Sequence, residues 1–264
     1  MSIWGSPVIT GGGNGVPLLT RAQWNALTDA QKQACGLVAI QDANSGFKRG
    51  VLAYGGDYVP SLLTASDYSL ILAEALWSDY ESGSTWGAVT LSGSGYSKTS
   101  ASVRLPVGSM GSVSLPSSNV SVTAYAVINN YAPTYGDLML LAVPYAINSG
   151  NLPAFFVRNG IIWKTVFSTD VSTGIASNAW HVLTLALDNG SKTCRYYIDG
   201  TAYSSLVYYN SGSFVSFSAA TSGSVASLNA DVAWVGVVSG AESESVILAN
   251  HANIMEKLSP YFES

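Results

Sequence analysis

The chain has 264 residues, only 10% of them charged, and its 16 acidic and 11 basic side chains give a formal net charge of −5. This length allows a sizeable core, and a composition low in charge and rich in Gly and Tyr is typical of a β-sheet protein rather than a helical enzyme. The acidic balance argues against a nucleic-acid partner, because no basic surface is present to replace the counterions of phosphates. No run approaches 18 apolar residues, so we expect no membrane span.

Residues 1–17 form a Gly-rich arm with the sequence MSIWGSPVITGGGNGVP. The arm has neither the basic nor the apolar region of a secretion signal, so we expect the chain to be made in the cytoplasm. It would reach any outside location by another route, such as assembly into a virus particle released by lysis. The arm has too little apolar surface to fold alone, so either its own body or a neighbouring subunit must hold it.

Residues 18–36 are expected to form two short helices or one broken helix. Thr20 with Gln23, and Thr28 with Gln31, match the capping box, in which the hydroxyl and the amide side chains satisfy backbone amides reciprocally. Gly36 is suited to follow the end of the second helix. The side chains expected to face inward are Trp24, Leu27 and Ala34.

A hairpin is expected next, with strands at 37–41 and 50–54 and a turn through Asn44-Ser45-Gly46. The segment SDYSLILAEALWSDYESG then predicts a helix with Ser66 as its N-cap. At helical spacing its polar residues share one narrow stripe, so the helix is apolar over most of its circumference and needs cover on more than one side. It either lies between two parts of its own chain or is shared with a partner.

This organisation predicts two parts. Residues 1–84 form an N-terminal arm with a helical and hairpin anchoring region, and residues 85–264 form a separate β domain. The residues expected to anchor the chain to a partner are Trp4, Leu18, Leu19, Trp24, Leu27, Leu72, Leu76 and Trp77.

From Trp86 onward, short segments of alternating polarity are separated by Gly, Ser and Asn turns, which is the pattern of a mainly β protein folded as an antiparallel sandwich. The strands expected are 120–128, 137–143, 154–158, 161–167, 182–188, 193–198, 215–219 and 231–238. A closing helix is expected within 240–259, and its packing residues are Val246, Leu248, Ile254 and Leu258.

Residues 178–203 predict a meander. Trp180-His181 begins an apolar strand, Asn189-Gly190 turns the chain, and the return strand ends at Asp199-Gly200. This order of motifs resembles concanavalin A-like and laminin-G-like jelly-roll domains over about residues 85–258. The resemblance implies an antiparallel jelly roll, whose relatives bind sugars, adhere to proteins or act as spacers. The first 80 residues are similar to docking segments on tailed-phage virion proteins.

The residues offer little for catalysis, and we expect no enzyme, no metal and no cofactor. Retaining glycosidases need two carboxyl groups about 5 Å apart, but Glu242 and Glu244 lie at a helix start and Asp79 and Glu81 at a helix end. His181 occupies the position of the family's structural histidine. The remaining groups are His251 and two cysteines that we expect to be buried thiols, Cys35 and Cys194.

Sugar binding requires aromatic rings on which a pyranose can stack, with polar groups that orient it. The candidate sugar-binding residues are Tyr131, Tyr135, Asp137, Tyr208 and Tyr209. The alternative is that these tyrosines decorate a strand-rich surface or fill a subunit contact. Loop acids that could bind Ca²⁺ are Asp137, Asp170 and Asp188, but they show no ligand-spaced cluster.

The sequence therefore predicts a non-enzymatic structural protein of a phage virion, such as a capsid decoration, a head fibre or a tail-associated adhesion module. Its partners would be other virion subunits, further copies of itself in a homo-oligomer such as a trimer, and a host-surface glycan. The alternative is a free-standing carbohydrate-binding lectin.

Overall fold

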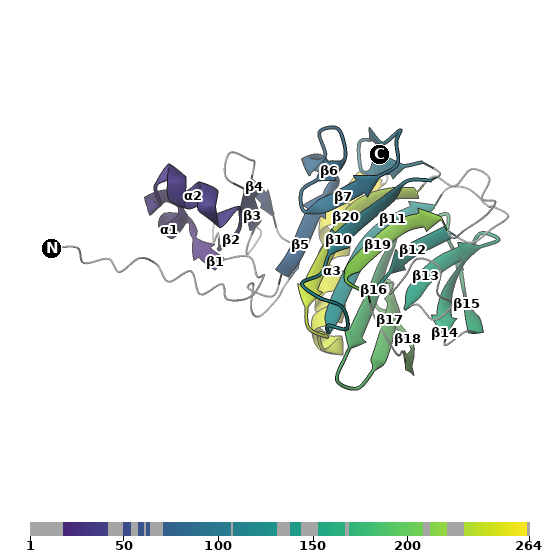
Figure 1. Cartoon of the computed structure of the whole chain (residues 1–264). Coiled ribbons are helices and arrows are strands. Elements are labelled where there is room, and N and C mark those ends of the chain that lie inside the picture. The colour runs from purple at the N-terminus through teal and green to yellow at the C-terminus, as the bar shows by residue number, and fades with distance from the viewer. Residues whose placement is uncertain are drawn as a thin grey trace.

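The computed structural model describes residues 18–41, 50–53, 58–60, 62–63, 71–106, 108–130, 138–143, 153–166, 169–207, 212–220 and 230–262. These residues form a small N-terminal sheet with two short helices, a large two-sheet sandwich and one long helix (Figure 1). The predicted arm at 1–17, including Trp4, lies outside the described residues. No described helix is long and apolar enough to cross a membrane.

The N-terminal module comprises four strands and two helices. Its sheet has the order β1-β2-β3-β4, with β1 parallel to β2 and the other pairs antiparallel. The elements are β1 (Leu18–Thr20), α1 (Arg21–Ala26), α2 (Asp29–Cys35), β2 (Leu37–Gln41), β3 (Gly50–Ala53) and β4 (Tyr58–Pro60). The predicted hairpin is confirmed by the pairing of β2 with β3, while its turn at Asn44-Ser45-Gly46 lies outside the described residues.

Both predicted capping boxes form. The Thr20 and Thr28 hydroxyls accept the amides of Gln23 and Gln31, whose side chains accept the threonine amides in return. Gly36 ends α2 with φ of 64°.

The module has a small core of its own. Trp24 is buried against Val38 and Ile40, and Leu19 and Leu27 pack on this core while remaining partly exposed. Ala34 was expected to face inward, but it is exposed. At the end of α2 the side chain that packs on this core is that of Cys35. The expectation for Ala34 is therefore wrong.

The sandwich consists of two eight-stranded sheets, which confirms the predicted antiparallel β-sandwich. The front sheet has the order β15-β14-β13-β12-β19-β10-β7-β6. Its strands are β6 (Thr85–Trp86), β7 (Val89–Ser92), β10 (Met110–Ser114), β12 (Leu138–Ala142), β13 (Ala154–Arg158), β14 (Ile161–Val166), β15 (Thr169–Ala176) and β19 (Phe214–Ala220).

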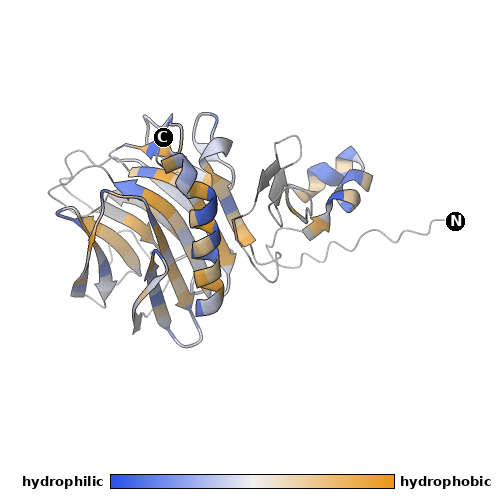
Figure 2. Ribbon diagram, turned by 180° about the vertical axis from the view of Figure 1, so that it is seen from behind, coloured by the Kyte–Doolittle hydropathy of each residue, from blue (hydrophilic) through white to orange (hydrophobic). Residues whose placement is uncertain are grey.

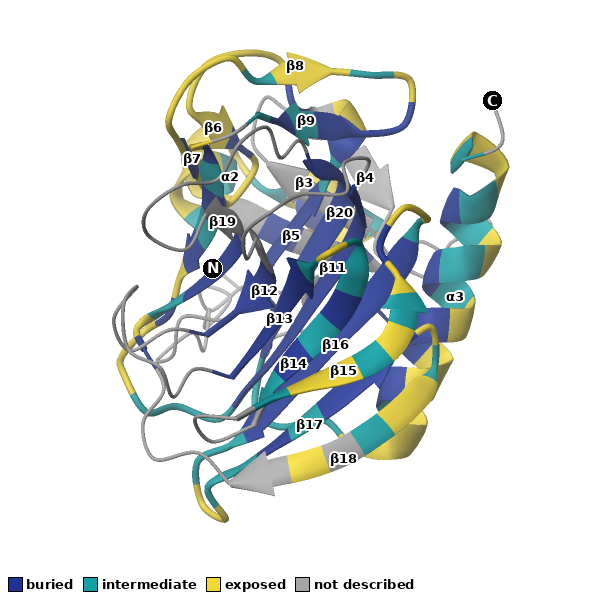
Figure 3. Ribbon diagram, turned by 90° about the vertical axis from the view of Figure 1, so that its right-hand side faces the viewer, coloured by how far each residue is buried: buried dark blue, intermediate teal, exposed yellow. Residues whose placement is uncertain are grey.

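The back sheet has the order β18-β17-β16-β11-β20-β9-β8, and β5 pairs with β20 beside β9. Its strands are β5 (Ile71–Leu76), β8 (Ser97–Lys98), β9 (Val103–Leu105), β11 (Val122–Asn130), β16 (His181–Asp188), β17 (Thr193–Ile198), β18 (Thr201–Val207) and β20 (Ala230–Ser239). The central strands β11, β16 and β20 are buried almost throughout, whereas the edge strands β8 and β18 carry exposed residues (Figure 3).

Both faces of the back sheet are covered. The front sheet packs on one face, and the helix α3 (Glu244–Phe262) lies along the other (Figure 2). Ile254 and Leu258 are buried as expected and Val246 is half-buried, but Leu248 is 38% exposed, so that expectation is wrong. The face of α3 that meets the sheet instead includes Asn250 and His251.

The helix expected from Ser66 onward is wrong. Residues 71–76 form β5, followed by the short 3₁₀ helix η2 (Trp77–Asp79). A six-residue segment with five apolar residues fits a buried strand as well as a helix, and β20 offers it backbone partners from Trp234 to Val238. Glu74 tolerates burial because its Oε1 accepts hydrogen bonds from the Leu62 amide at 2.7 Å and from Trp234 Nε1 at 3.1 Å.

The expected anchoring residues of this segment lie on their own sandwich. Trp77 is buried, and Leu72 and Leu76 pack partly exposed against the same core. Their contact with a partner stays a prediction, as does the division at residue 84. The sandwich strand β5 lies on the N-terminal side of that division.

Candidate functional site

The predicted sugar-binding residues Tyr131, Tyr135, Asp137, Tyr208 and Tyr209 all lie outside the described residues. The described strands that precede them finish at opposite ends of β16 (His181–Asp188): β11 finishes beside His181, and β18 finishes at Val207, which pairs with Thr193, the partner of Asp188. A role of these five residues in sugar binding stays a prediction.

A different group of side chains stands out on the outer face of the front sheet. Phe155, Val157 and Ile162 belong to the sandwich core. Because side chains alternate along a strand, Phe156, Arg158 and Trp163 point away from that core. With Asp170 of β15, these three residues form what we call the outer cluster: Phe156, Arg158, Trp163 and Asp170.

The outer cluster is built in two layers. Phe156 and Trp163 are directly paired across β13 and β14, and their rings stack with centroids 6.4 Å apart and an interplanar angle of 26°. The guanidinium of Arg158 lies over both rings, 5.0 Å from the Phe156 centroid and 5.2 Å from that of Trp163. Beyond the rings, Arg158 Nη2 donates to Asp170 Oδ2 at 2.8 Å.

The cluster is accessible at its polar end. The Arg158 and Asp170 side chains are each 33% exposed, whereas Phe156 is 5% exposed. Half-exposed ion pairs of this kind contribute only about 1 kcal/mol or less, so a ligand that replaced the pairing would face a small cost. Rings, a planar guanidinium and a carboxylate are the ordinary components of a sugar-binding surface. Arg158 and Asp170 can therefore hydrogen-bond the hydroxyl groups of a ligand, and the partly exposed Trp163 lies beside them.

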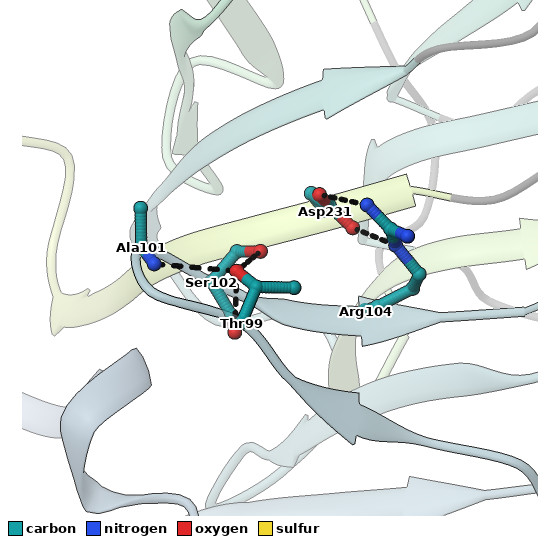
Figure 4. Close-up of polar contacts among 5 residues, drawn as sticks. All are labelled: Thr99, Ala101, Ser102, Arg104 and Asp231. Atoms are coloured by element: carbon teal, nitrogen blue, oxygen red, sulfur yellow. Dashed lines mark hydrogen bonds and ion pairs between the residues drawn. The ribbon is translucent and has the colours of Figure 1, made fainter. Parts of the chain in front are cut away.

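A second guanidinium–carboxylate pair serves a structural role. Arg104 of β9 donates from Nε and Nη2 to the two Asp231 oxygens, at 2.8 and 2.9 Å (Figure 4). Asp231 is 2% exposed. The pair fastens the short strand β9 to β20, and the hydrogen-bonded turn between Thr99 and Ser102 leads into β9.

His181 is held between two acceptors. Its Nδ1 lies 2.7 Å from Asp199 Oδ2 and its Nε2 lies 2.8 Å from the Ala176 carbonyl oxygen. Neither acceptor can donate, so both contacts are hydrogen bonds only when both ring nitrogens carry protons, and the arrangement favours the imidazolium form. Burial lowers the pKa of His181, but the hydrogen bond and charge of Asp199 and the Ala176 carbonyl outweigh it and raise the pKa above its usual value. The expected packed histidine is confirmed.

His251 of α3 is held in the opposite protonation state. The Gly200 amide donates to its Nδ1 at 2.7 Å, which requires Nδ1 to be unprotonated, and Nε2 donates to Thr184 Oγ1 at 2.7 Å. Burial lowers the pKa of His251 to about 4, although the charge of Asp199 acts against it. Both histidines are thus committed to hydrogen bonds that hold the fold.

Two of the acids named above, Glu242 and Asp188, are engaged in hydrogen bonds. The Tyr125 hydroxyl donates to Glu242 Oε2 at 2.5 Å, and burial raises the pKa of both groups. Glu244 is exposed in the first turn of α3. Asp188 accepts from the Gly190 amide and the Ser191 hydroxyl of its own turn. No group of three or more potential metal ligands occurs in the described part of the chain.

The two cysteines are free thiols. Cys194 is buried as expected, and burial raises its pKa to about 12. Cys35 was also expected to be buried, but it is only half-buried at the end of α2.

No protein-family model and no curated protein sequence matches the chain. Solved structures with a similar fold include a Trypanosoma rangeli sialidase in complex with sialic acid, at 12% identity and a TM-score of 0.61, covering 74% of this chain and 34% of the sialidase. They also include an HCR/D mutant, at 11% identity and a TM-score of 0.51, and the binding domain of botulinum neurotoxin serotype D/C, at 11% and 0.49. Each of these two matches covers 70% of this chain and 52% of the other.

The chain thus spans about a third of the sialidase and about half of the two other proteins. At these identities the similarity shows the fold alone, an antiparallel β-sandwich.

We predict opposite pH effects from the two histidines. His181, whose pKa is raised, stabilises the fold below pH 6.5, and this contribution is lost as pH rises through its folded pKa. His251, whose pKa falls to about 4, makes the fold lose about 3 kcal/mol as pH decreases from 6.5 to 4.

Urea unfolding from pH 4 to 8 measures both effects. His251→Gln, which can still accept from Gly200, should remove the acid-side decline relative to the parent chain, and His181→Gln should remove the decline on the alkaline side. Parallel pH curves for the parent and both variants would contradict the assigned protonation states.

The two arginine pairs should differ in their contribution to stability. Arg104→Ala leaves the Asp231 carboxylate buried without its partner and should lower the free energy of unfolding by about 3 kcal/mol. Arg158→Ala removes a half-exposed pair and should lower it by about 1 kcal/mol. Equal losses in denaturant unfolding would show that the outer cluster is a structural element like the Arg104 pair.

Proposed function

We propose that the chain is a non-enzymatic structural protein of a tailed-phage virion, in which the N-terminal module mounts a lectin-type sandwich that binds a glycan. The observation that carries the glycan-binding part is the position of the outer cluster. The back sheet is covered by α3 (Figure 2), whereas no described helix lies over the outer face of β13–β15 (Figure 1). On that face Arg158 and Asp170 reach the solvent beside two stacked aromatic rings.

The mounting role is supported by the separate core of the N-terminal module. Trp24, Val38 and Ile40 form a cluster distinct from the sandwich core. Two complete capping boxes fix its short helices. A module with its own core can change partners or orientation without disturbing the sandwich, which suits a chain that is attached at one end and displayed at the other.

The proposal of a non-enzymatic protein is supported by the hydrogen bonds that engage the titratable side chains. His181, His251 and Glu242 each hold a neighbouring element through hydrogen bonds. A general acid or base must be able to reach a substrate proton, and none of these three side chains is exposed.

A free-standing carbohydrate-binding protein is the second candidate. It is favoured by the burial of Trp24 and Trp77, two of the residues expected to anchor the chain, within the protein itself. These side chains have little surface left for a partner.

The glycan-binding role predicts a specific effect of Trp163→Ala. Loss of the indole should weaken binding on a glycan array about fivefold, because an aromatic contact contributes about 1 kcal/mol. Trp180→Ala is the matched control, since Trp180 stacks on Phe262 and belongs to the back-sheet side. Equal binding by the two variants, both folded by circular dichroism, would contradict a site at the outer cluster.

The mounting role predicts that the full chain forms homo-oligomers through its N-terminal module. Trp24→Asp disrupts the small core and should give monomers in analytical ultracentrifugation, while glycan binding is retained. A monomeric parent chain at high concentration would favour the free-standing lectin.

A further inference from the structure

The proposed function leaves open which class of glycan the outer cluster binds, and the following inference rests on that function. We propose that the cluster binds neutral, hydroxyl-bearing saccharides and discriminates against acidic ones, with Asp170 as the residue that determines this specificity.

The first observation is the charge balance of the outer face. Among the described outward-facing side chains of β13, β14 and β15, Arg158 is the cation and Asp170 the anion. Lys164 does not contribute, because it faces inward and is 2% exposed, with its ammonium 5.4 Å from the ring centroid of the core residue Tyr196. The face therefore presents no net positive charge to a sugar carboxylate.

The second observation is the free acceptor on Asp170. Arg158 Nη2 donates to Oδ2, and no other described group hydrogen-bonds to this carboxylate. The Asp170 side chain is 33% exposed, so its second oxygen can accept a hydrogen bond from a ligand. A sugar hydroxyl donates, whereas the carboxylate of an acidic sugar has no proton at neutral pH and would repel Asp170.

The third observation is a hydroxyl beside the rings. Ser172 is paired directly with Trp163 across β14 and β15, and it is exposed. Its Oγ accepts from the Gly174 amide at 3.2 Å, so its proton is available to a ligand oxygen. Ser172 as a donor and Asp170 as an acceptor flank the aromatic pair. A sugar hydroxyl both accepts and donates, so it matches this arrangement.

The test uses the full chain and two sugars that differ only in an acidic cap, lactose and sialyllactose, with dissociation constants measured by calorimetry or on a glycan array. The parent chain should bind lactose more tightly. Asp170→Asn keeps an acceptor oxygen but removes the negative charge. It should bind lactose within about twofold of the parent and sialyllactose about fivefold more tightly than the parent, the size expected for a half-exposed charge.

Asp188→Asn is the control for the charge change, because it removes an acid from the turn between β16 and β17 of the back sheet. It should leave both affinities unchanged. Preferential binding of sialyllactose by the parent, or an unchanged preference in Asp170→Asn, would overturn the specificity while leaving glycan binding in place. Absence of binding to any glycan on a broad array would overturn the proposed function itself.

Discussion

The hydrogen bond from the Gly200 amide to Nδ1 of His251 joins α3 to the turn that ends β17. Asp199 and Gly200 both have positive φ, 50° and 78°, as a tight two-residue turn requires. This geometry directs the Asp199 carboxylate toward β16, where its oxygens accept from the Val182 amide and from His181. Helix, turn and strand are thus fixed by one dipeptide.

The same turn also reaches the front sheet. His181 donates from its other nitrogen to the Ala176 carbonyl at the end of β15. The following residue, Ser177, accepts from the Asn130 amide and donates to the Gly160 carbonyl. The Trp-His and Asp-Gly motifs, which carry the resemblance to jelly-roll domains, therefore explain how the two sheets are held together. They carry no information about a ligand, because their polar groups are used inside the fold.

The two sheets of the sandwich differ in how their outer faces are covered, because α3 packs on only one of them. The outer face of the back sheet bears Tyr125, Thr184 and other side chains that contact the helix. A ligand-binding role on that side would require the helix to leave. The front sheet keeps its polar cluster at the outer face of β13–β15, where the same chemistry remains available to solvent. The helix α3 therefore covers the outer face of one sheet, while no described helix covers that of the other.

Strands with strong turn signals were predictable from the sequence. The boundaries of β13 and β17 agree with the prediction, because Asn159-Gly160 and Asp199-Gly200 end them sharply. The capping boxes likewise located α1 and α2. β5 was not predictable, since its apolar run fits a helix or a strand and only the distant residues 234–238 decide between them.

The outer cluster was partly predictable from the sequence. The Asn159-Gly160 turn sets the register that opposes Phe156 to Trp163, and alternation places Arg158 on the same face. Two facts were missing. Both faces of β13 are apolar, so the pattern does not tell which face is outward. The contact of Arg158 with Asp170 also depends on the pairing of β15 and on a side chain that extends along the strands.

The pairing of β5 with β20 has a mechanical consequence. β5 is the first described strand of the sandwich and lies antiparallel to β20, with partners from Leu76 to Ile71. A pull applied along the axis of β5 would load its backbone hydrogen bonds to β20 together, in shear, so that they would not open one after another. A sandwich tethered through this strand would withstand tension at its attachment point far better than one tethered through a frayed edge.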